Sequence, residues 1–128
     1  MDMFIVLSVL ALSITIIAII YMIKNEYTII RVNGWSMNPT LKHGQLYLLT
    51  RSMDDWYYGG LEVGRIYVIC PPHTGHNSIK RLKSIKHNST SGGFYLWFEG
   101  DNKEDSIDSR NYGFLRETDV IGRVVTKK

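Results

Sequence analysis

One serine stands in a setting that suits a nucleophile. Ser36 lies between Trp35 and Met37, shortly after a long apolar run, and a turn signal at residues 38–40 follows it. Small, apolar and turn-forming residues crowd around its hydroxyl. A serine hydroxyl attacks a carbonyl carbon only when another group removes its proton. The rest of the chain therefore has to supply a general base.

Histidine is the usual base for a serine nucleophile. The four histidines, however, all fall in polar turns or loops, and none stands beside an acid as a Ser-His-Asp arrangement requires; they are His43, His73, His76 and His87. His73 and His76 are close in sequence, but no further Cys, Asp or Glu is placed to complete a metal site with them. The pattern favours solvent-exposed loop histidines, with no metal and no cofactor.

Lysine is the alternative base. A free lysine has a pKa of ~10.4 and is almost fully charged at pH 7, but burial can lower that pKa by up to about 3–5 units. Lys80 lies inside a predicted strand, residues 78–86, whereas most of the 15 lysines and arginines lie in loops. Alternation places Lys80 with Leu82 on one face, opposite Ile79 and Arg81. Strand lysines are usually exposed, so the pattern alone does not decide whether Lys80 is buried.

A second dense polar stretch covers residues 100–113. Its acids do not follow the alternate-position spacing of a helical calcium loop, and no glutamate closes such a loop at its twelfth position. Asp108 and Arg110 are two residues apart, with Asp101 and Ser106 nearby. An arginine beside several carboxylates indicates an internal ion pair.

The N-terminal segment predicts a membrane anchor. Residues 3–23 carry no charge, and about 20 apolar residues suffice for a helix to cross the hydrocarbon core. A cleaved signal peptide would have a shorter apolar core, a basic start and a small-residue exit. We therefore expect residues 1–26 to be an uncleaved single-pass anchor. Lys24 and Arg31 follow the run and none precedes it, so the positive-inside rule weakly favours a cytoplasmic C-terminal domain.

The remaining residues, 27–128, predict one mainly β domain. Apolar, β-branched and aromatic runs predict strands at residues 27–33, 46–50, 64–70, 78–86, 94–99 and 118–126. We expect an N-terminal transmembrane helix followed by a small antiparallel β sandwich or partly closed barrel. The single cysteine, Cys70, is expected to be an inert residue of a buried strand. The adjacent aromatics Trp56-Tyr57-Tyr58 are either core plugs or interface anchors.

Composition excludes some partners. The net charge is only +3, the basic residues are mixed with acids, and no Lys/Arg stripe stands out. Nucleic-acid binding requires such a basic surface. We expect a mixed, solvated surface and no nucleic-acid partner.

Three segments in order, residues 34–41, 78–81 and 100–113, resemble the type I signal peptidases, which are membrane-bound Ser/Lys proteases. The resemblance covers residues 32–124 and implies the signal-peptidase fold. It implies Ser36 as nucleophile, Lys80 as general base and Ser106 as the hydroxyl that orients the lysine amine. Lysine rather than histidine at position 80 resembles the bacterial and organellar branch.

The resemblance also implies supporting roles. Asp108 and Arg110 would form an ion pair behind the site, with Asp101 in the same structural part. The Ser36 backbone N–H would hold the oxyanion; some relatives add a serine hydroxyl two residues earlier, where this chain has Gly34. An extended substrate would lie between the strands at 32–34 and 78–80. Shallow pockets for small substrate residues would be shaped by Val32, Met37, Leu41 and Ile79.

The implied activity is the removal of N-terminal signal peptides from exported preproteins, with small residues at the first and third positions before the cut. The catalytic domain would lie on the extracytoplasmic side of the cell membrane, against lipid, although the local charges favour the other side. Trp35 is then either a lipid-surface residue or an ordinary core tryptophan. Alternatives are a dedicated or organellar inner-membrane processing peptidase, and a catalytically silent anchored binding module.

Overall fold

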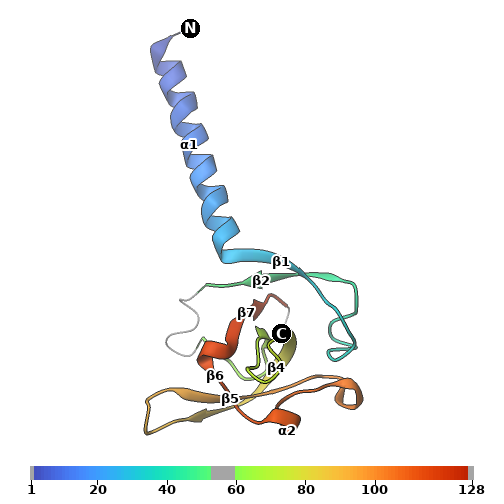
Figure 1. Ribbon diagram of the computed structural model, residues 1–128. Helices are drawn as coiled ribbons and strands as arrows, with labels where there is room; N and C mark the ends of the chain where they lie inside the picture. Colours follow the sequence, from blue (N-terminus) through green and yellow to red (C-terminus); the bar gives the residue numbers. More distant parts are fainter. Residues whose placement is uncertain (1, 53–59, 127–128) are drawn as a thin grey trace.

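The computed structural model describes residues 2–52 and 60–126. A long helix, α1 (Met3–Glu26), projects from a single antiparallel sheet (Figure 1). The strands are β1 (Tyr27–Arg31), β2 (Leu46–Thr50), β3 (Ile66–Ile69), β4 (Ser78–His87), β5 (Phe94–Glu99), β6 (Leu115–Arg116) and β7 (Val120–Val124). Three short helices lie near the C-terminus: η1 (Lys103–Asp105), α2 (Ser109–Tyr112) and η2 (Glu117–Asp119).

The helix α1 is apolar and exposed along its whole length. Its 24 residues span about 36 Å at 1.5 Å per residue, more than the ~30 Å of a hydrocarbon core. The hydroxyls within it, such as that of Ser8, donate to backbone carbonyls one turn earlier. Within the described chain it is the one helix long and apolar enough to cross a membrane. It passes directly into β1 at Tyr27.

The seven strands form one sheet in the order β1-β2-β7-β3-β4-β5-β6. Every neighbouring pair is antiparallel. The first and last strands in this order do not pair with each other, so the sheet curls into a half-barrel rather than a closed one. The predicted mainly β fold with an N-terminal apolar helix and a partly closed barrel is confirmed.

Strand β3 is buried at all four positions. The buried apolar residues form two clusters, and β3 contributes side chains to both. Because side chains alternate along a strand, its residues divide between the two faces of the sheet. Tyr67 and Ile69 join one cluster, while Ile66 and Val68 join the other. The second cluster also contains Val32, Met37 and Leu41, the apolar residues around Ser36.

Some local predictions were wrong. Cys70 follows β3 instead of lying in it, and it is half-buried rather than a core residue. The stretch 100–113, predicted as loop, contains η1 and α2, and β6 follows it. These elements are too short for a hydrophobic period to show in the sequence. The aromatics Trp56-Tyr57-Tyr58 lie outside the described residues.

Candidate active site

Ser36 and Lys80 meet in the structure. The Lys80 Nζ donates a hydrogen bond of 2.8 Å to the Ser36 Oγ. Lys80 shares a face of β4 with Leu82, as alternation predicts, and it is only 4% exposed. Burial lowers the pKa of the Lys80 amine, although the negative charges of Asp108 and Asp105 act in the opposite direction. A lowered pKa increases the fraction of amine that is neutral and able to accept a proton.

The loop that carries Ser36 is held by its own apolar residues. Met37 and Leu41 are each 1% exposed, so they fix the loop against the core on either side of the turn. The Leu41 N–H donates to the Met37 carbonyl at 3.0 Å. Trp35, in contrast, is 55% exposed, which excludes the interpretation as a core tryptophan. The loop is therefore anchored by Met37 and Leu41 in the core, while Trp35 beside the serine projects toward solvent.

The later segment at 100–102 holds the serine backbone. The Asn102 N–H donates to the Ser36 carbonyl at 2.9 Å, and the Asn102 side chain donates to the Trp35 carbonyl at 3.1 Å. At Gly100, a Cβ atom would clash with the Ser106 side chain and lie 2.6 Å from the Ser36 carbonyl oxygen. Asn102 was given no role from the sequence, where only its place in a motif marked it.

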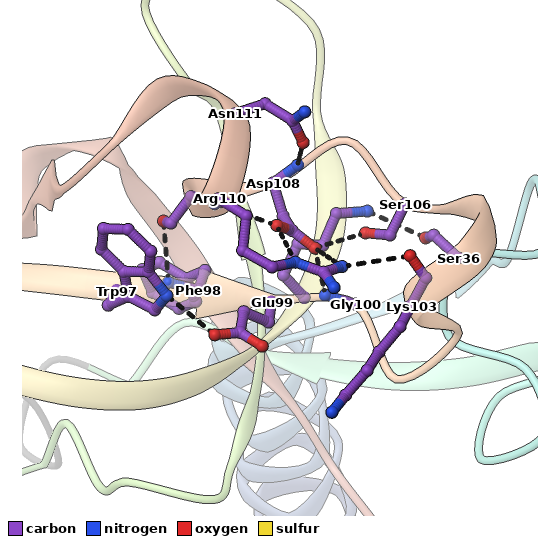
Figure 2. A network of polar contacts seen from close by, with 12 residues as sticks. Ser36, Trp97, Phe98, Glu99, Gly100, Lys103, Ser106, Asp108, Arg110 and Asn111 are labelled. Atoms are coloured by element: carbon purple, nitrogen blue, oxygen red, sulfur yellow. Dashed lines mark hydrogen bonds and ion pairs between the residues drawn. The ribbon is translucent and has the colours of Figure 1, made fainter.

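Ser106, Asp108 and Arg110 form one network (Figure 2). The Asp108 carboxylate accepts from the Ser106 hydroxyl at 2.7 Å, from the Gly100 N–H at 2.8 Å, and from the Arg110 guanidinium at 2.8 and 2.9 Å. Burial alone would raise the pKa of Asp108, but the hydrogen bonds from Arg110, Gly100 and Ser106 hold it well below its usual range. Because Ser106 donates to Asp108, its oxygen lone pairs stay free to accept. Its hydrogen bond in the described chain is thus to Asp108 and not to Lys80.

Asp101 lies in a different ion pair. Its carboxylate accepts from the Arg81 guanidinium at 2.8 and 2.6 Å, and the Thr40 hydroxyl donates to it as well. Hydrogen bonding to Arg81 lowers the pKa of Asp101 despite partial burial. Asp101 therefore ties the end of the serine loop to the strand that carries Lys80. Arg81 was not predicted as a site residue, although it adjoins Lys80 in sequence.

Backbone donors around the serine differ in availability. Within residues 2–52 and 60–126, no group accepts a hydrogen bond from the Ser36 N–H. The Gly34 N–H is occupied, because it donates to the His43 Nδ1 at 2.9 Å. The Ser36 N–H is thus free to donate to a bound group, while the Gly34 N–H is not.

Two grooves open on either side of the Ser36–Lys80 contact. One, of about 400 Å³, runs between β1 and β4 and is lined by Val32, Met37 and Ile79 among others. The second, of about 500 Å³, is lined in part by Trp35, Asp105 and Ser106. Leu41, predicted to shape a substrate pocket, is buried in the core and lines neither groove.

The comparison with known families agrees with this geometry. The family model described as signal peptidase, peptidase S26, matches residues 3–86 and 84–127. The chain belongs to this family. It is therefore a peptidase of the signal-peptidase type, and the family acts on preproteins that carry signal peptides. A search of curated proteins found no match.

The family match extends over the N-terminal helix as well as the sheet. The match begins at residue 3, so it includes α1, which fits a single-pass membrane anchor. Within the described residues, no three His, Cys, Asp or Glu side chains are gathered in a way that could hold a metal ion.

Proposed function

We propose that this protein is a membrane-anchored serine endopeptidase, a signal peptidase I, in which Ser36 is the nucleophile and Lys80 the general base. Residues 1–26 would be the anchor and residues 27–128 the catalytic domain. The observation that carries the proposal is the 2.8 Å contact between the Ser36 Oγ and a Lys80 amine that is 4% exposed. An exposed, charged lysine could not act as a base at neutral pH.

The reaction has two halves. Neutral Lys80 takes the proton of Ser36 as the Oγ attacks the carbonyl carbon of the scissile peptide bond. The carbonyl oxygen becomes an oxyanion that accepts a hydrogen bond from the Ser36 N–H. The C–N bond then breaks, Lys80 gives its proton to the departing amine, and an ester to Ser36 remains. Lys80 next takes a proton from water as the water oxygen adds to the ester carbon. The C–O bond to Ser36 then breaks, and Lys80 returns the proton to the Ser36 Oγ, which restores the serine and releases the carboxylic acid.

Ser106 and Asp108 would orient the lysine in this scheme. Ser106 donates to Asp108, so its oxygen is free to accept an N–H from the Lys80 amine once that amine turns from Ser36. Arg110 compensates the buried charge of Asp108. Asp101 and Arg81 would keep the serine loop against β4.

The substrate would be an extended stretch of preprotein lying in the groove between β1 and β4. Val32, Met37 and Ile79 make that groove apolar, and its modest volume of about 400 Å³ suits small side chains before the cut. Signal peptides of exported preproteins meet this description. The exposed Trp35 beside the serine would contact lipid.

Two substitutions test the mechanism in the detergent-solubilised full chain. Ser36→Ala and Lys80→Ala should each lower the rate of preprotein cleavage by roughly 10³-fold or more, since each removes a reacting group. Lys86→Ala is the matched control, because Lys86 is an exposed lysine on the same strand; it should cleave normally. Substantial cleavage by either alanine variant, with its fold intact by circular dichroism, would rule the mechanism out.

A dedicated processing peptidase uses the same chemistry for one substrate. The short connection between β4 and β5, residues 88–93, is compatible with this variant, because the domain carries little structure beyond its single sheet. A panel of unrelated preproteins separates the two functions. A general signal peptidase cuts most of the panel, whereas a dedicated enzyme cuts one member.

A further inference from the structure

His43 touches the two residues that precede the nucleophile. Its Nδ1 accepts a hydrogen bond from the Gly34 N–H at 2.9 Å. Its ring stacks on the Trp35 indole, with centroids 5.2 Å apart and planes inclined by 23°. The sequence predicted His43 to be an exposed loop histidine. It is exposed, but its Nδ1 lone pair and its aromatic ring both contact the serine loop.

The imidazole extends the pairing between the two chain segments that flank the serine loop. The Val32 N–H donates to the Gln45 carbonyl at 2.9 Å, and the Gly44 N–H donates to the Val32 carbonyl at 2.8 Å. At the next step toward Ser36, the acceptor for the Gly34 N–H is the His43 side chain instead of a carbonyl. Within the described residues, no other group accepts from this N–H.

Gly34 makes this restraint important. Its φ of +103° lies in the region that glycine alone adopts readily, and a Cβ at this position would meet nothing within 4 Å. A glycine without side-chain packing has wide conformational freedom. One residue separates it from Ser36, so a rotation at Gly34 swings both Trp35 and the nucleophile. The His43 contacts limit that rotation.

We propose that His43 is a positioning residue for Ser36. By fixing Gly34 and Trp35 it keeps the Ser36 Oγ against Lys80 and the Ser36 N–H toward the groove. The inference rests on the proposed function of the Ser36–Lys80 pair, and it assigns His43 no contact with the reacting atoms. The Nδ1 needs its lone pair to accept, so the proton of the neutral ring lies on Nε2. Gly34 and Trp35, the residues in contact with the ring, carry no ionisable side chain.

Two variants separate the two contacts of the ring. His43→Phe retains a flat ring for Trp35 but has no acceptor. His43→Asn loses the ring but keeps an acceptor, because the asparagine Oδ1 occupies the same place along the side chain as the histidine Nδ1. His87→Phe is the matched control, since His87 is also exposed and also packs on an aromatic ring, that of Phe94, outside both grooves.

The test is steady-state cleavage of a preprotein by the full chain in detergent. His43→Phe should lower kcat by about tenfold, the effect of one lost hydrogen bond in a group that aligns the nucleophile, and should change KM much less. His43→Asn should recover most of kcat, and His87→Phe should match the wild type. In ¹⁵N spectra of the wild type, His43 should show a protonated Nε2 and an acceptor Nδ1.

Two results with the variants would overturn the positioning role: wild-type kcat in a folded His43→Phe, or a loss in His43→Asn as large as in His43→Phe. A protonated Nδ1 at neutral pH in the wild type would also overturn it, and this readout needs no variant to fold. Failure of the proposed function looks different. In that case the wild type does not cleave, or Ser36→Ala cleaves as well as the wild type.

Discussion

The Lys80 amine is subject to two opposing influences. Burial favours its neutral form, while the carboxylates of Asp108 and Asp105 favour its charged form. The negative charge of Asp108 is offset by its ion pair with Arg110. Asp105 is exposed on η1 at the wall of the larger groove, and within the described residues its carboxylate has no hydrogen bond or ion pair. A substitution at Asp105 should therefore change the pKa of Lys80 without disturbing the packing around Lys80.

Asp105→Asn should move the acid side of the pH–kcat profile to lower pH. Removing a negative charge near Lys80 lowers the pKa of the amine further, and the neutral amine is the active form, so activity persists to more acid conditions. The measurement is kcat for preprotein cleavage from pH 5 to pH 10. Glu104→Gln, a neighbouring exposed acid, should leave the profile in place. A shift toward higher pH would contradict the role assigned to Lys80.

For single residues, the sequence predicted which side chains lie at the site better than it predicted the hydrogen bonds that hold them. Ser36 was marked by its neighbours, and alternation along β4 placed Lys80 on one face with Leu82. Alternation does not tell which face is covered, because the cover over Lys80 comes from the distant serine loop. His43 and Asn102 were missed for a similar reason, since their roles depend on hydrogen bonds to loop backbone that no local pattern reports.

The segment from Gly100 to Gly113 is the element that packs against the loop carrying Ser36. It contacts the serine loop through Asn102 and surrounds Asp108 through the cap of α2, where the Asp108 side chain accepts from the Arg110 N–H at 3.1 Å. At Gly100 the segment passes so close to Ser106 and the Ser36 carbonyl that no side chain fits. The element is thus a close-packed wall against the backbone of Ser36.

Gly100→Ala should impair catalysis because the added methyl group displaces Ser106 and the Ser36 backbone. We expect kcat to fall on the order of 10²-fold, as for a misplacement of about 1 Å, and stability to fall by about 1–3 kcal/mol. Gly93→Ala is the control, since its Cβ would make ordinary contacts, the nearest at 3.7 Å. Normal kcat in Gly100→Ala would show that the wall does not fix the nucleophile.

Asp108→Asn should reduce the free energy of unfolding by about 2 kcal/mol at pH 7, the scale of a hydrogen bond to a charged group. The pKa of Asp108 lies below its unfolded value of about 3.9, so the folded state favours the ionised form. This stabilisation is complete above the unfolded value, weakens below it, and is lost in full only as the pH falls through the lower pKa of the folded state. Chemical denaturation at pH 7 and pH 3 should therefore show a smaller difference between wild type and variant at pH 3. A difference that grows in acid would contradict the assignment.

Strand positions were the most predictable part of the fold. The bounds of β2 and β5 agree with the predicted runs, because each is a continuous apolar and aromatic stretch between turn residues. The helix α2 was not predicted, since its four residues are set by the capping of Asp108 and not by an apolar period. Short elements that depend on a cap need the tertiary partner before they can be recognised.

On the scale of the whole molecule, α1 and the sheet are continuous, because α1 ends at Glu26 and β1 begins at Tyr27. The domain therefore lies at the membrane surface if α1 spans it. Lys24 favours a cytoplasmic domain by the positive-inside rule, with a weak charge difference. The substrates favour the opposite side, because the cleavage site of an exported preprotein emerges there.

We predict an extracytoplasmic catalytic domain. Protease added to intact cells or right-side-out vesicles should digest residues 27–128 and leave a fragment the size of α1. A cytoplasmic protein, probed in the same sample, should survive until the membrane is lysed. Protection of the domain until lysis would place it in the cytoplasm and exclude exported preproteins as its substrates.

The place of β7 in the sheet has a consequence for the timing of activity. Ser36 follows β1, which pairs with β2, while Lys80 belongs to β4, which pairs with β3. In the described sheet, β7 is the strand that joins these two units, and it is the last strand to be synthesised. Without β7 the sheet divides into β1-β2, which leads into the serine loop, and β3-β4-β5-β6, which carries Lys80. We therefore expect the Ser36–Lys80 contact to depend on β7, which is translated after both residues.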